Sequence, residues 1–128
     1  TSATATGVRD GHTKVDDGSI GFDLASSQNT KDKHGTNSEQ FFAMGYAACF
    51  DSAINHVAPS LGLKPTNSST SVAVGIGQKL DGAFGLDWDI TITVEGLTET
   101  EAKTLIQRAH EVCPYSNATR GNVNVRLH

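Results

Sequence analysis

The side chains best suited to chemistry are the thiols of Cys49 and Cys113, the two cysteines of this 128-residue chain. They lie far apart in the sequence and form no CxxC pair, which excludes the spacing of a zinc ribbon or a thioredoxin-type motif. In a reducing compartment two cysteines do not indicate a structural disulfide framework. They are therefore either small buried apolar residues or a redox pair that the fold brings together.

The positions of the two thiols predict unequal reactivity. Cys49 lies on the apolar face of one predicted helix, and Cys113 lies in the last turn of another. If these helices pack together, the thiols come within disulfide reach, which needs Cα atoms closer than about 7 Å. The negative end of the macrodipole disfavours a Cys113 thiolate, so Cys113 is the better resolving thiol. Cys49 in an apolar wall needs an arginine, lysine or protonated histidine from elsewhere in the fold.

Two helices must position these thiols. The first follows the N-cap residues Asn37 and Ser38, has Glu39 in its first turn, and ends before Pro59. Its apolar stripe recurs at steps of three or four and consists of Phe42, Tyr46, Cys49, Ala53 and Val57.

The second helix opens with a capping box at Thr98 and Glu101, and Pro114 ends it. Alternating apolar residues predict a hairpin of strands near 72–76 and 86–94. A last strand is expected at 123–127, and short strands are expected in the N-terminal part, including 20–24. This order predicts an α+β domain with a mostly antiparallel sheet.

Composition excludes several classes of function. The net charge of −4 and the absence of a Lys/Arg run argue against nucleic-acid binding. No apolar stretch approaches the roughly 20 residues of a membrane span, and the first residues lack a signal-peptide pattern, so a cytoplasmic protein is expected. The five histidines show no metal-ligand spacing, and no bound metal is expected. The apolar share of 37% is low, which favours completion of the core by a partner subunit.

Three separated motifs carry a resemblance to a known family. They are Ala5-Thr6-Gly7-Val8-Arg9-Asp10-Gly11-His12, then Asn37-Ser38-Glu39-Gln40 leading into Gly45-Tyr46-Ala47-Ala48-Cys49-Phe50, and Val112-Cys113-Pro114-Tyr115-Ser116-Asn117-Ala118-Thr119-Arg120-Gly121-Asn122. Together they closely resemble the organic hydroperoxide resistance (Ohr) branch of the OsmC/Ohr family, over essentially the whole chain.

The resemblance implies one α+β domain over residues 1–128, with mostly antiparallel sheets around two long helices per chain. It implies an intertwined homodimer with active sites at the subunit interface. Cys49 matches the family's peroxidatic cysteine and Cys113 its resolving cysteine. Arg9 matches the arginine that stabilises the thiolate and the peroxide, and Glu39 matches the glutamate that orients it. No bound cofactor is implied; the reductant is an external dithiol, a lipoyl group carried by a lipoylated protein.

The expected chemistry is reduction of organic hydroperoxides. The Cys49 thiolate attacks the distal peroxide oxygen, which leaves an alcohol and a sulfenic acid, and Cys113 condenses with that acid to a disulfide. We expect Phe42, Tyr46 and Phe50 to form an apolar wall that favours alkyl and lipid hydroperoxides over hydrogen peroxide.

One distance conflicts with a site built from a single chain. Glu39 and Cys49 are ten residues apart, so one straight helix separates their backbones by about 15 Å. Either the helix breaks near Gly45, or Glu39 and Arg9 reach the thiol from the other subunit; we favour the second.

Two other functions remain open at this point. One is a non-catalytic redox sensor or apolar-ligand module, whose thiols switch without turnover. The other is acyl transfer by Cys49 with a histidine base, which is weak because no histidine belongs to a recognisable Cys-His arrangement.

Overall fold

The computed structural model describes residues 1–7, 10–26, 35–122 and 126–128. The chain forms two compact units, Thr1–Phe41 and Phe42–His128, which are described separately below.

The first unit is built on a three-stranded antiparallel sheet. Its strands are β1 (Ala3–Thr6), β2 (His12–Val15) and β3 (Gly21–Asp23), paired in the order β1-β2-β3. The predicted strand at 20–24 is thereby confirmed. Most residues of this sheet are exposed.

Helix α1 runs from Ser38 to Val57. Asn37 caps the start of the helix through a reciprocal pair of hydrogen bonds. The Gln40 backbone N–H donates to Asn37 Oδ1, and the Asn37 backbone N–H donates to Gln40 Oε1, each at 2.9 Å. The predicted N-terminus is confirmed. The helix continues through Gly45 without interruption, so the alternative of a break there is wrong. A short 3-10 turn, η2 (Pro59–Leu61), follows it.

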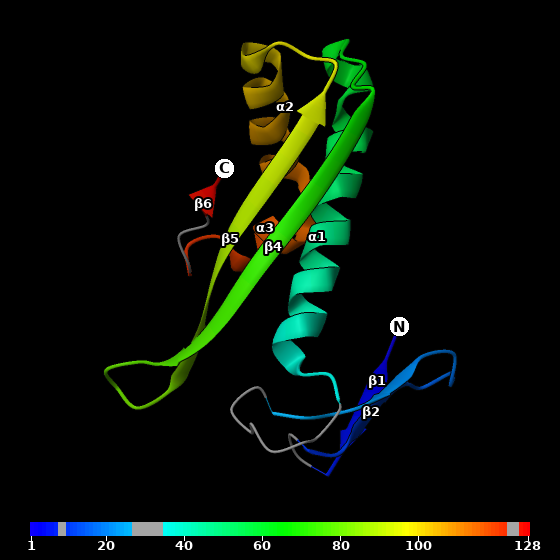
Figure 1. The fold of residues 1–128 in the computed structure, drawn as a ribbon, viewed down its shortest axis with the longest axis vertical. Helices are drawn as coiled ribbons and strands as arrows, with labels where there is room; N and C mark the ends of the chain where they lie inside the picture. Colours follow the sequence, from blue (N-terminus) through cyan, green and yellow to red (C-terminus); the bar gives the residue numbers. More distant parts are fainter. Residues whose placement is uncertain (8–9, 27–34, 123–125) are drawn as a thin grey trace. The chain divides into compact units, whose positions relative to one another are not determined.

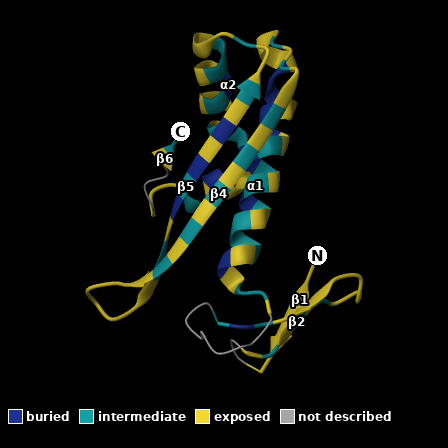
Figure 2. Cartoon of the chain, viewed as in Figure 1, coloured by how far each residue is buried: buried dark blue, intermediate teal, exposed yellow. Residues whose placement is uncertain are grey.

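The second unit contains a long hairpin made of β4 (Asn67–Gln78) and β5 (Phe84–Glu95). The two strands pair along their whole length, with Val72 opposite Ile90. Alternate residues of the hairpin are exposed, while the residues between them face the helices that cover one side of it (Figures 1 and 2). The predicted hairpin is therefore confirmed.

The end of the chain adds a short edge to this hairpin. Strand β6 (Arg126–Leu127) pairs with β5 in parallel, so the sheet is mostly but not wholly antiparallel. The predicted last strand was longer, and its positions 123–125 lie outside the described residues.

Helix α2 (Glu99–Val112) begins with the predicted capping box. The Glu101 amide donates to Thr98 Oγ1 at 3.3 Å, and the Thr98 amide donates to Glu101 Oε2 at 2.9 Å. Pro114 does end this helix, but it also begins a further helix that was not predicted, α3 (Pro114–Thr119). Cys113 is both the C-cap residue of α2 and the N-cap residue of α3.

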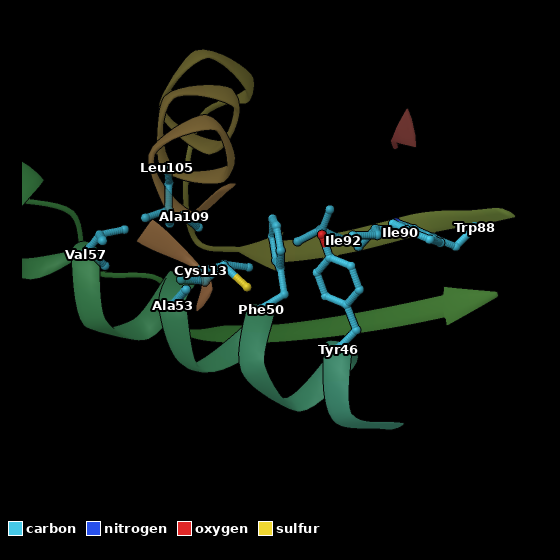
Figure 3. Packing of buried hydrophobic residues seen from close by; sticks show 12 residues of the cluster. Tyr46, Phe50, Ala53, Val57, Trp88, Ile90, Ile92, Leu105, Ala109 and Cys113 are labelled. Carbon is cyan, nitrogen blue, oxygen red and sulfur yellow. The ribbon is translucent and has the colours of Figure 1, made fainter. Parts of the chain in front are cut away.

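The core of the second unit lies between α1, α2 and the inner face of β5 (Figure 3). Its buried side chains are Tyr46, Phe50, Ala53, Ile54, Val57, Ala58, Trp88, Ile90, Ile92, Leu105, Ala109 and Cys113. The fold class is α+β, as predicted. Within the described residues, no helix has the length and apolar character needed to cross a membrane.

Candidate active site

The two thiols meet in the core of the second unit. The Sγ atoms of Cys49 and Cys113 are 3.6 Å apart, and both cysteines are in the free form. The prediction that the helices bring these thiols together is confirmed. Cys113 is fully buried, whereas Cys49 is partly accessible from outside. The accessible thiol can be reached by a substrate, and the buried thiol can be reached mainly by its neighbour.

The surroundings of Cys49 oppose its ionisation. Burial raises the pKa of the Cys49 thiol, and the nearby Cys113 thiol raises it further. A hydrogen bond from the Tyr115 amide lowers that pKa, but not enough to cancel the effect of burial. The expectation that Cys49 needs a cation to become a strong nucleophile is therefore consistent with the geometry of the second unit.

The short helix α3 is the main part of the site that the sequence patterns did not predict. Pro114 takes its first position, where a missing N–H costs nothing, and the Tyr115 amide in the same turn points at the Cys49 sulfur. Cys113 therefore lies between a helix C-terminus and a helix N-terminus. The α2 macrodipole is thus not the only helix dipole that acts on Cys113, which corrects the expectation from the sequence. The Cys-Pro step was the available signal, because proline favours the first turn of a helix.

A buried polar chain links α3 to both long helices. The Tyr46 hydroxyl and Ser116 Oγ are 2.9 Å apart, and His110 Nδ1 lies 3.0 Å from the same Ser116 oxygen. Tyr46 and Ser116 are fully buried and His110 is half-buried.

The helices approach closely where Tyr115 crosses α1. A Cβ atom on Gly45 would lie 2.8 Å from the Tyr115 hydroxyl and 3.2 Å from its ring. Gly45 therefore does not break the helix; it makes room for the Tyr115 ring beside the thiols.

The predicted aromatic wall is only partly available to a substrate. Tyr46 and Phe50 have no exposed surface and project from α1 into the core (Figure 3). They are therefore covered in this structure, and a contact of either with a substrate stays a prediction. Phe42 is partly buried and packs against Trp88, with ring centroids 5.1 Å apart. A contact between Phe42 and a substrate stays a prediction.

A pocket lies beside Cys49, on a face of α1 other than the one that carries Tyr46 and Phe50. It is a mostly apolar pocket of about 610 Å³. The residues that line it are Cys49, Ser52, Ala53, His56, Val112 and Pro114. Four of these follow the spacing i, i+3, i+4 and i+7 along α1, which is the pattern of one helix face. That spacing could have located the pocket from the sequence.

Arg9 and Glu39 remain untested as parts of the site. Arg9 lies outside the described residues. Glu39 is buried in the first turn of α1, and its Oε1 accepts a hydrogen bond of 3.1 Å from the Ser38 hydroxyl. Within the described part of the chain, no three histidine, cysteine or acidic side chains gather in a way that could hold a metal ion.

Comparison with known proteins decides the family. The family model described as OsmC-like protein matches residues 30–128. The organic hydroperoxide resistance protein of Xanthomonas axonopodis pv. citri is 45% identical over 98% of this chain and 89% of its own length. This chain belongs to the OsmC/Ohr family. Both the Cys49 motif and the Cys113 motif lie within the matched residues.

Solved structures of OsmC/Ohr proteins have the same fold. The OhrB protein of Bacillus subtilis matches with a TM-score of 0.92 at 40% identity, covering 99% of this chain and 95% of that one. An organic hydroperoxide resistance protein from Elizabethkingia anophelis matches with a TM-score of 0.90 at 46% identity, covering 98% and 91%. The α+β fold predicted from the motifs is thereby confirmed as an OsmC/Ohr fold.

Proposed function

We propose that this protein is a cysteine-based peroxidase that reduces organic hydroperoxides to alcohols. The observation that carries the proposal is the pair of free thiols at 3.6 Å, of which Cys49 opens onto an apolar pocket and Cys113 is buried behind it. The relatives named organic hydroperoxide resistance proteins support the same substrate class.

The proposed reaction uses each thiol once. The Cys49 thiolate attacks the distal peroxide oxygen, the O–O bond breaks, and the alkoxide takes a proton to leave as an alcohol. Cys49 is then a sulfenic acid. The Cys113 sulfur attacks that sulfur, the S–O bond breaks, and hydroxide leaves as water after taking a proton. Exchange with an external dithiol, for which we propose a lipoyl group on a partner protein, restores both thiols.

The cation that Cys49 needs is proposed to come from a second copy of the chain. Glu39 and Cys49 lie on one unbroken helix, which separates their backbones by about 15 Å. An Arg9 held by Glu39 therefore serves the Cys49 of the partner chain in a homodimer. Arg9 stabilises the thiolate there, and Glu39 orients the guanidinium through paired hydrogen bonds.

The pocket at Cys49 supports a preference for alkyl and lipid hydroperoxides. Ala53, Val112 and Pro114 give it an apolar lining, which gains free energy with an alkyl chain and none with hydrogen peroxide. The same pocket fits the alkyl stem of a lipoyl group. We also propose a cytoplasmic location, because thiols that an external dithiol must restore require a reducing compartment.

Turnover tests the proposal. Purified protein with dihydrolipoamide should consume an alkyl hydroperoxide repeatedly, and faster than hydrogen peroxide. Cys49→Ser should abolish consumption. Cys113→Ser should keep one oxidation of Cys49 but lose recycling and accumulate sulfinic acid. Thr104→Ala is a control, because its exposed hydroxyl donates to the Thr100 carbonyl on the same helix, α2.

The main competing function is a redox sensor that switches without turnover. It predicts one oxidation per chain and then no further consumption with any dithiol. That result, or full activity in Cys49→Ser, would contradict the peroxidase.

A further inference from the structure

We infer that Ser116 is a positioning residue for the resolving step: its hydroxyl ties α3 to both long helices and so holds Cys113 against Cys49. The inference rests on the proposed peroxidase function and deepens it. The proposed role of Ser116 is exerted through the position of α3, not through a bond to a reacting sulfur atom.

The hydroxyl of Ser116 bonds to side chains of two other helices. Its Oγ lies 2.9 Å from the Tyr46 hydroxyl on α1 and 3.0 Å from His110 Nδ1 on α2. One hydroxyl thus joins three helices in the interior, where Ser116 has no exposed surface. A buried serine needs its hydrogen bonds, and here both of its bonds lead to elements that carry or flank a thiol.

One arrangement of protons satisfies every donor and acceptor in the Tyr46–Ser116–His110 network. Burial lowers the pKa of His110, and the nearby Arg120 lowers it further, which favours the neutral imidazole. Neutral Nδ1 can accept the Ser116 proton, and Ser116 can accept the proton of Tyr46. The Arg120 guanidinium also donates to the His110 carbonyl at 2.7 Å, which ties the end of α3 to α2.

The first turn of α3 carries groups that contact both cysteines. Cys113 caps its first turn, and the Cys113 carbonyl accepts the Asn117 amide at 2.9 Å. The same turn presents the Tyr115 amide to Cys49. Ser116 lies in the middle of this turn, so its two side-chain bonds set where the Cys113 sulfur lies relative to α1.

The distance between the sulfurs explains why this placement matters. A disulfide bond is about 2 Å long, so the two Sγ atoms at 3.6 Å must approach by only about 1.5 Å. Resolution competes with a second peroxide, which converts the sulfenic acid to sulfinic acid. Misplacing a reacting group by about 1 Å can slow a reaction by up to about a hundredfold, so a loosened α3 favours overoxidation.

The experiment measures how the Cys49 sulfenic acid partitions after peroxide is added. Wild type, Ser116→Ala and His110→Leu are oxidised with an alkyl hydroperoxide, and the sulfenic acid is trapped with dimedone at timed intervals. Intact mass then gives the disulfide, sulfenic and sulfinic fractions. In Ser116→Ala we expect disulfide formation to slow at least about tenfold, well beyond any change in the first oxidation. His110→Leu, which removes one of the two bonds, should lie between it and wild type.

Two controls separate positioning from a general loss of stability. Ile92→Val removes one buried methyl from β5 in the same core without touching the polar chain. It should leave the partition as in wild type. His110→Asn restores an acceptor near the position of Nδ1 and should recover part of what His110→Leu loses.

The outcomes distinguish this inference from the proposed function. Equal partitions in Ser116→Ala and Ile92→Val, or no recovery in His110→Asn, would overturn the role of Ser116 and leave the peroxidase standing. A wild-type protein that forms no sulfenic acid with an alkyl hydroperoxide would overturn the peroxidase. In that case hydrogen peroxide is used as the oxidant instead, and the partition of the Cys49 sulfenic acid between disulfide and sulfinic acid still tests the role of Ser116.

Discussion

A mixture of two inactive variants tests whether the active site is shared between chains. Arg9→Ala removes the proposed cation, and Cys49→Ser removes the nucleophile. In a shared site, a dimer with one chain of each kind keeps one intact site, where Cys49 of the first chain meets Arg9 of the second. The other site of that dimer lacks both groups. A site built within one chain gives no intact site in any such dimer.

The magnitude follows from the symmetry of a two-fold dimer. In the proposed dimer, each mixed dimer has one of its two sites intact, so the purified mixed dimer should have about one half of wild-type activity. Random pairing makes about half of the dimers mixed, so the unpurified mixture should recover about one quarter. The structural reason to expect recovery is the unbroken α1, which keeps Glu39 about 15 Å along the helix from Cys49.

The assay needs only dimers of defined composition. The two variants are refolded together or expressed together with different tags, and the doubly tagged species is purified and assayed with an alkyl hydroperoxide and dihydrolipoamide. Separately refolded homodimers mixed just before the assay are the control. No recovery in a doubly tagged dimer that is folded would refute the shared site and return Arg9 and Glu39 to the chain that carries Cys49.

Three further predictions concern the packing around the thiols. Ser116→Ala should lower the free energy of unfolding by about 1–3 kcal/mol in a urea titration, because the Tyr46 hydroxyl and His110 Nδ1 lose a buried partner. An unchanged free energy of unfolding would mean that these hydrogen bonds are not formed. The pKa of His110 is lowered in the folded protein, so protonation favours the unfolded state, and this contribution to stability should be lost as pH falls below about 6.5. Urea titrations across this range should show a smaller loss in His110→Asn than in wild type, and equal losses would contradict the assignment. Replacing a helix glycine by alanine usually raises the free energy of unfolding by about 1 kcal/mol. Gly45→Ala should not show this increase, because the new Cβ would meet Tyr115. An increase in thermal stability of that size would contradict the close approach.

Local features were predicted because their causes are local. The cap at Asn37, the capping box at Thr98 and the alternation along the β4–β5 hairpin depend on residues within one or two turns or strands. The family was also accessible from the sequence, because its motifs are runs of adjacent residues. Helix α3 was missed although it is local, since Pro114 was interpreted only as the end of the preceding helix.

The orientation of side chains across the core was harder to predict. A stripe of apolar residues on α1 indicates that this face is covered, but not by what. The same pattern was therefore compatible with Tyr46 and Phe50 facing a substrate, whereas packing against β5 and α2 leaves them no exposed surface. The surface near Cys49 is formed instead by the adjoining face of α1 with Val112 and Pro114.

The sequence by itself determined the residue types that can do chemistry, the two long helices with their caps, and the family. Only the tertiary structure decided that the sulfurs of Cys49 and Cys113 lie 3.6 Å apart, which of them is accessible, and that Ser116 joins Tyr46 and His110. These contacts are between residues that lie far apart in the sequence. They depend on how whole helices pack against one another, which no local sequence pattern encodes.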